Sequence, residues 1–221
     1  MTSKYAVSIA LCALALTGCP SSSEDADGGI GHPPDADPLT PDAAPRADGA
    51  PIIDGGACNP MVTFHGPTDA PAPHVAEGTS VVYETNPPCF GPHYPVWARW
   101  GETYAAGVLG PSYWVHNLEH GGVVFQFNCP EAGGCPDVVA QLQALEAALP
   151  DDPLCTSQQP PLHTRTLITS NTLLPAGVQV AVSAWHWTYT ASCFDAASLR
   201  SFYDDHFGHG SEALCGNGSR P

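Results

Sequence analysis

The feature that most constrains this chain is the segment 20–57, which lacks the side chains that a folded core requires. It contains seven Pro, six Gly, seven Asp and seven Ala, no aromatic residue and only four large apolar residues. So little apolar surface cannot offset the loss of chain entropy on folding, and eight acidic residues against Arg46 make the segment self-repelling. We therefore expect residues 19–57 to form a disordered acidic tether and residues 58–221 to form one globular domain.

The N-terminus predicts export and lipid attachment. An apolar run from Tyr5 to Leu16 follows Lys4 and leads into Thr17, Gly18 and Cys19. Because a permanent transmembrane helix needs about 20 apolar residues, residues 1–18 are predicted to be a signal peptide. The small residues before Cys19 resemble the lipobox of bacterial lipoproteins, whose cysteine carries diacylglycerol and a further acyl chain such as palmitate; several acyl chains anchor a protein stably.

The predicted location is therefore the bacterial cell envelope, with the membrane as a partner through the N-terminal lipid. Pro20 after Cys19 is not a simple inner-membrane retention signal, which favours the outer membrane if the cell has one. The alternative is an ordinary signal peptide followed by a chance cysteine.

The charge of the chain excludes one large class of partners. Its 22 acidic residues against six Lys and Arg give a formal net charge of −16. No basic surface is available to neutralise phosphates, so we expect neither nucleic-acid binding nor a phosphate-handling role. Nothing in the sequence identifies a protein partner or a small-molecule ligand.

Seven cysteines lie in the predicted domain, and none of them has the Cys-x-x-Cys spacing of zinc ribbons or redox motifs. In an exported chain, structural disulfides are the default. We predict the pairs Cys129–Cys135, Cys155–Cys193 and Cys58–Cys215, which is one of the fifteen pairings that six cysteines allow. One thiol remains unpaired.

Periodicity predicts two amphipathic helices and several strands. The helices are expected at 137–149, with Asp137 as N-cap, and at 195–207, with Asp195 as N-cap and Gly208 at the end. His206 and His209 are expected to interact, when protonated, with the dipole at the end of the second helix. Strands are expected at 81–85, 123–127, 167–169 and 178–185. The fold class is therefore a compact, disulfide-braced α+β domain with a mostly antiparallel sheet and two helices on one face.

Between these elements, residues 86–122 form an irregular segment that is rich in Pro, Gly, aromatic residues and histidine, as functional loops often are. His116 and His120 are four residues apart, which places them on one side of either a helix or a strand. Glu119 adds a carboxylate, and His93 follows the rigid pair Gly91-Pro92. Three imidazoles and a carboxylate suit zinc or copper, so His93, His116, His120 and Glu119 are the predicted ligands of a transition metal.

Other interpretations of this segment stay open. The histidines could be structural, with Glu119 paired to Arg99, in a binding or structural module without metal. The domain could instead be a metal-assisted hydrolase or oxidase with Glu119 as general base, its one candidate catalytic residue. A Cys89–His93 pair could act as nucleophile and base.

Residues 116–120 also match H-x-x-E-H, the pattern of inverzincin proteases. That family requires a continuous helix and a distant Glu ligand. Here Gly121-Gly122 and a strand follow at once, and Glu212 near the C-terminus is the only Glu far downstream. We therefore do not expect a protease of that family.

The same segment resembles a known family. Two stretches carry the likeness: Asn86-Pro87-Pro88 through Gly91-Pro92-His93-Tyr94, Trp97, Trp100-Gly101 and Tyr104, and the run from Val115 to Val124. Together they look like the bacterial family catalogued as domain of unknown function 3105, closely over 86–127 and more loosely through the second helix. The resemblance implies that the four predicted ligands are shared motif positions, that members are often exported or membrane-attached, and that no activity is established. The chain departs from the family at Cys89-Phe90, which is why Cys89 is the predicted free thiol.

Overall fold

The computed structural model describes residues 57–66, 72–129 and 134–219. The predicted signal peptide, Cys19 and the tether up to residue 56 lie outside these residues. Within the described part of the chain, no helix is long and apolar enough to cross a membrane.

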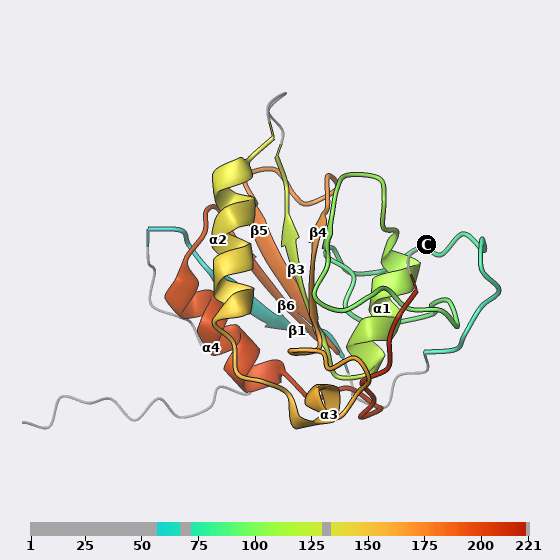
Figure 1. Ribbon diagram of the computed structural model, residues 1–221. Coiled ribbons are helices and arrows are strands. Elements are labelled where there is room, and N and C mark those ends of the chain that lie inside the picture. The colour runs from blue at the N-terminus through green and yellow to red at the C-terminus, as the bar shows by residue number, and fades with distance from the viewer. Residues whose placement is uncertain (1–56, 67–71, 130–133, 220–221) are drawn as a thin grey trace, which may run out of the picture. The chain divides into compact units, whose positions relative to one another are not determined.

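A six-stranded sheet forms the centre of the domain, with strand order β1-β6-β5-β3-β4-β2 (Figure 1). The strands are β1 (Met61–Phe64), β2 (Thr103–Tyr104), β3 (Val123–Phe127), β4 (Thr166–Ser170), β5 (Val180–Ala184) and β6 (Trp187–Ala191). The helices are α1 (Pro111–Glu119), α2 (Pro136–Ala147), α3 (Pro153–Thr156) and α4 (Ala196–His206). β3 pairs with β4 in parallel and with β5 antiparallel, and the β5–β6 and β6–β1 pairs are also antiparallel. The predicted α+β class and mostly antiparallel sheet are confirmed.

The sheet is covered on both faces (Figure 1). On one face, α2 and α4 pack Leu142, Leu199 and Phe202 against β3, β5 and β6, as the two-helix prediction requires. On the other face, α1 contributes Trp114 and Leu118 to a second apolar cluster. Because successive strand residues face opposite sides, the all-buried pattern of β3 and β5 fits strands that are covered twice.

The prediction for the second helix is confirmed, and that for the first is shifted. The Asp195 carboxylate accepts from the backbone N–H groups of Ala197 and Ser198 and caps α4. In α2, Pro136 occupies the first turn, so Asp137 lies inside the helix rather than at its cap. The predicted strand at 81–85 is wrong, because this run has alternating burial but pairs with no other strand.

The helix α1 is one of the elements that the sequence did not predict, and it lies inside the segment 86–122 that was expected to be irregular. Gly110 precedes a Pro in the first turn, which is a common way for a helix to start. His120 is the C-cap, and Gly121 follows with φ +77°, a left-handed conformation that a side chain disfavours. This glycine turns the chain directly from α1 into β3.

All six predicted half-cystines form disulfides, but two of the three predicted pairings are wrong. Cys129 pairs with Cys135 as predicted, whereas Cys58 pairs with Cys193 and Cys155 with Cys215. The reason is β1, which the sequence analysis did not predict. Its antiparallel pairing with β6, extended beyond Met61, brings Cys58 opposite Cys193. Cys155 lies in α3, where the C-terminal segment passes.

His206 does not have the role predicted for it. Its ring stacks on Trp187 at a centroid distance of 4.4 Å and packs against Phe202. Burial lowers the pKa of His206 to about 4, so the imidazole is neutral at pH 7 and does not bring a positive charge to the helix end.

Candidate metal centre

The C-terminal turn of α1 carries three of the four predicted ligands. Trp114 and Leu118 bury the sheet-facing side of the helix. His116, Glu119 and the capping residue His120 lie on the turn next to the C-terminal segment. His116 and His120 are almost fully buried, with their Nε2 atoms 3.2 Å apart. The predicted convergence of these two histidines is present in the structure.

Glu119 and His93 meet although 26 residues separate them. His93 is fully buried, and its Nε2 lies 3.0 Å from Glu119 Oε2. Glu119 thus contacts His93 and not Arg99, the partner considered from sequence. Its pKa is lowered, because burial alone would raise it but the hydrogen bond and charge of His93 outweigh that effect.

Backbone carbonyls fix the protonation of two rings. His93 Nδ1 lies 2.9 Å from the Gly91 carbonyl, and His116 Nδ1 lies 2.6 Å from the Tyr94 carbonyl. A carbonyl can only accept, so each Nδ1 carries a proton. In the neutral ring of His116, Nε2 then presents a lone pair to the cluster, whereas His93 Nε2 donates to Glu119 and can ligate an ion once that proton is displaced. Metal-ligating histidines typically donate their other N–H in this way. Structural hydrogen bonding and metal ligation are therefore compatible in these two residues.

His74 belongs to the same cluster and was not predicted. The backbone of residues 73–75 runs beside His93: Val75 N donates to the His93 carbonyl over 2.8 Å, and His93 N donates to the Pro73 carbonyl over 3.2 Å. This bridge brings His74 Nε2 to 3.5 Å from Glu119 Oε2, with the His74 side chain half exposed. The ligand atoms of His74, His93, His116 and Glu119 all lie within 4.8 Å of one another. We call these four residues the first ligand group.

His120 lies outside the first ligand group and joins a second. Its Nε2 is 3.3 Å from Glu212 Oε2, and one ligand atom from each of Glu119, His120 and Glu212 lies within 4.8 Å of the others. We call these three residues the second ligand group. From the sequence, Glu212 was considered only as the distant Glu of the inverzincin pattern and was not among the predicted ligands. No periodicity or motif connects His74 or Glu212 to residues 116–120, so only the fold shows them.

The imidazoles of α1 are poor proton acceptors. Burial lowers the pKa of His116 to about 4, against the opposing effect of the Tyr94 carbonyl. Burial, followed by the charge of His116, lowers the pKa of His120 to about 4. Both rings are therefore neutral at pH 7, the form in which a histidine can ligate a metal.

The C-terminal segment is held against the end of α1 by backbone contacts. Gly208 N donates to the Gly121 carbonyl and Glu212 N to the Glu119 carbonyl, each over 2.9 Å. A Cβ atom on Gly210 would lie 2.2 Å from the Glu119 carbonyl oxygen and from Gly121 N. This approach requires glycine and places the Glu212 side chain beside His120.

A buried ion pair supports the same turn from the other side. Arg165 Nε lies 2.6 Å from Asp152 Oδ2, and both side chains are buried. The Arg165 guanidinium also donates to the His120 carbonyl. The end of α1 thus receives a cation where the helix dipole is negative.

Cys89 is unpaired, as predicted, and fully buried. Burial raises the pKa of its thiol to about 12, so it does not form a thiolate at pH 7. The ring nitrogens of His93 are turned to the Gly91 carbonyl and to Glu119. The geometry therefore contradicts the Cys89–His93 nucleophile pair.

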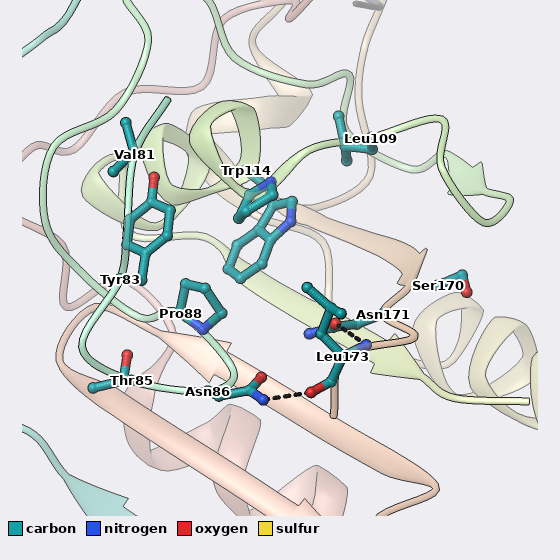
Figure 2. Close-up of a pocket in the computed structure, with 11 residues that line it drawn as sticks. Val81, Tyr83, Thr85, Asn86, Pro88, Leu109, Trp114, Ser170, Asn171 and Leu173 are labelled. Carbon is teal, nitrogen blue, oxygen red and sulfur yellow. Dashed lines mark hydrogen bonds between the residues drawn. The ribbon is translucent and has the colours of Figure 1, made fainter. Parts of the chain in front are cut away.

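The pocket of Figure 2 is separate from both ligand groups. It has a volume of about 300 Å³ and lies between the N-terminal half of α1 and residues 81–88. Tyr83, Pro88 and Trp114 form its wall, with Leu173 at its edge, where the Asn86 amide donates to the Leu173 carbonyl. None of the candidate ligands lines this pocket.

Comparison with known proteins agrees with the resemblance noted from the sequence. No curated protein and no solved structure matches the chain. The family described as "Protein of unknown function (DUF3105)" matches residues 74–216, which include every member of both ligand groups. Since this match covers more than half of the sequence, the chain belongs to the DUF3105 family.

Proposed function

We propose that the protein is a lipid-anchored component of the bacterial cell envelope whose domain binds a transition-metal ion, zinc or copper, through His74, His93, His116 and Glu119. The observation that carries the proposal is the convergence of three imidazole nitrogens and one carboxylate oxygen within 4.8 Å. Imidazole with carboxylate is a donor set that both metals accept.

The spacing of the donor atoms supports a shared ion. Four tetrahedral ligands at about 2.1 Å from one ion lie about 3.4 Å from each other. Glu119 Oε2 is 3.0 Å from His93 Nε2 and 3.5 Å from His74 Nε2, so small movements suffice for ligation. The half-exposed His74 ring gives an ion a route from solvent, and the acidic chain attracts cations.

Metal content is the direct test. The mature chain, secreted to an oxidising compartment and purified without chelator or a nickel column, is expected to contain zinc or copper by elemental analysis, or to take it up on reconstitution. His74→Ala removes one ligand from the surface and is expected to weaken zinc affinity at least tenfold in competition with a chromophoric chelator. His163→Ala is the matched control, because His163 is exposed and outside both groups.

Substitution of a buried ligand needs a separate measurement of folding beside that of metal affinity. His116→Ala is expected to lower affinity further, with the near-UV circular dichroism of the metal-free protein confirming the fold. A protein that stays metal-free after reconstitution would refute the proposal. So would wild-type affinity in both His74→Ala and His116→Ala.

The anchor is supported by the order of residues 16–19 and by the three disulfides, which suit an oxidising compartment. Metabolic labelling with palmitate is expected to mark the wild-type chain and to fail after Cys19→Ala. Cys12→Ala, in the predicted signal peptide, is the control and should keep the label. Labelling that survives Cys19→Ala would show that Cys19 is not the lipidated residue.

A further inference from the structure

We propose that the centre is binuclear: a second divalent transition-metal ion is held by Glu119, His120 and Glu212, and the Glu119 carboxylate bridges the two ions. The inference rests on the proposed function, because it shares Glu119 with the first ligand group. It extends that function to residues of the C-terminal segment, 92 positions downstream of His120 in the case of Glu212.

Glu119 is placed to serve both ions. Its contacts to His74 and His93 both use Oε2, while one of its oxygens lies within 4.8 Å of ligand atoms of His120 and Glu212. A carboxylate has two oxygens and can ligate one ion with each. Paired ions in such sites lie about 3.5–4 Å apart, a separation that one bridging carboxylate spans.

His120 has more acceptors around it than its proton can satisfy. Its Nε2 faces His116 Nε2 at 3.2 Å and Glu212 Oε2 at 3.3 Å. His116 Nε2 holds a lone pair, because its proton is on Nδ1, and the carboxylate also only accepts. One proton on His120 serves one of them, whereas a cation near His120 interacts favourably with all three groups.

The proton of the neutral His120 ring can lie on Nδ1, which leaves the Nε2 lone pair available to ligate an ion. Unlike Nδ1 of His93 and His116, this Nδ1 has no hydrogen-bond partner within the part of the chain that the structure describes, although the atom is buried. No carbonyl therefore fixes its proton, and either nitrogen can be the unprotonated one. The ring is 1% exposed, and its Nε2 is directed at Glu212 Oε2, the exposed side chain of the group.

Charge at the second ligand group favours a cation. Two carboxylates approach a neutral imidazole there, and Arg165 is already engaged with Asp152 and the His120 carbonyl. The Glu212 side chain is 56% exposed, which opens the group to solvent. The backbone hydrogen bond from Glu212 N to the Glu119 carbonyl holds the backbone of this residue beside the end of α1 before any ion binds.

The experiment counts ions. The metal-free mature chain is titrated with zinc alone, and bound zinc is measured by elemental analysis after gel filtration. Two equivalents per chain are expected for the wild type and one for Glu212→Gln, which removes an exposed charge without disturbing a buried residue. Glu84→Gln is the matched control, since Glu84 is exposed and in neither group, and it should bind two.

A magnetic measurement tests the bridge itself. With copper(II) in both sites, two ions joined by one carboxylate are expected to couple, so that the paramagnetic resonance spectrum integrates to fewer than two spins and shows a half-field signal. Glu212→Gln should restore the spectrum of one isolated copper ion.

Each result decides a different claim. One equivalent in both the wild type and Glu212→Gln would overturn the second site and leave the first intact. Two equivalents in Glu212→Gln would show that Glu212 does not hold an ion, which also overturns the inference. A wild type that binds neither zinc in this titration nor copper(II) in the magnetic experiment would refute the proposed function together with the inference. Two uncoupled copper ions would refute the bridge.

Discussion

Replacement of Gly210 by Ala tests whether the C-terminal segment positions the second ligand group. The new Cβ would lie 2.2 Å from both the Glu119 carbonyl oxygen and Gly121 N, and 2.7 Å from the Gly121 Cα. All three are backbone atoms at the end of α1, so no flexible side chain can move aside. The segment must therefore lift away from the helix.

The cost follows from what the lift disrupts. Overpacking a buried contact costs about 1–3 kcal/mol. The hydrogen bonds from Gly208 N and Glu212 N to the α1 turn would also lengthen or break, at about 1 kcal/mol each. We expect a total loss of about 3–5 kcal/mol, which lowers the Tm of a domain of this size by roughly 6–20 °C.

Differential scanning calorimetry and zinc titration measure the two consequences together. Gly210→Ala should melt at lower temperature and bind one zinc ion fewer than the wild type, because Glu212 moves away from His120. Gly110→Ala is the control: its Cβ meets no atom within 4 Å, and its φ is not positive. We expect that control to cost less than about 1 kcal/mol, from its position at the helix cap. If Gly210→Ala melts within about 2 °C of the wild type, the argument from close backbone approach is wrong.

Four further results are expected. Asp152→Ala leaves the buried Arg165 guanidinium without its carboxylate partner and should lower the free energy of unfolding in urea by about 3–5 kcal/mol. A loss below about 1 kcal/mol would show that the ion pair is not needed for stability. Replacing both Cys155 and Cys215 by Ser removes a disulfide between residues 60 positions apart and should cost about 4 kcal/mol of unfolding free energy. The variant should also lose the second zinc equivalent, because the segment carrying Glu212 is released. A variant that still binds two equivalents would contradict this link. Burial lowers the pKa of His206 to about 4, so as the pH falls the unfolded state binds a proton at this residue before the folded state does, and the free energy of unfolding decreases between pH 6.5 and 4. His206→Phe should remove up to about 3 kcal/mol of that decrease. Parallel curves of unfolding free energy against pH for the variant and the wild type would refute the shift. Free zinc at 100 times its Kd should stabilise the folded chain by about 2.7 kcal/mol, and a chelator should reverse this; an unchanged Tm would indicate that zinc does not prefer the folded state.

Local patterns of the sequence predicted the parts of the fold that depend on neighbouring residues. The 3.6-residue periodicity and Asp195 located α4, and the alternation of Val123, Phe125 and Phe127 located β3. The helix α1 carries an equally local signal in Gly110-Pro111, but the many Pro and Gly residues around it favoured an irregular segment. That error left the H-x-x-E-H residues without a secondary structure.

Long-range features could not be predicted in the same way. The pairing of Cys58 with Cys193 depends on β1 lying at the sheet edge beside β6. His74 reaches the cluster through an isolated backbone bridge to His93. Both depend on contacts between segments with no shared periodicity, so their sequence positions alone contain no information about their separation in space.

The segments that meet the end of α1 explain why one five-residue motif serves two ligand groups. The four-residue spacing keeps His116 and His120 on one side, with their Nε2 atoms 3.2 Å apart, and Glu119 projects beside them. Here the helix stops at Glu119, His120 caps it, and Gly121 turns the chain away. Glu119 then faces His93 on one side, while His120 faces the segment that carries Glu212 on the other. Because the Nε2 atoms of His116 and His120 are so close, the two groups adjoin, and it is the segment that meets each ring that distinguishes them and leaves Glu119 common to both.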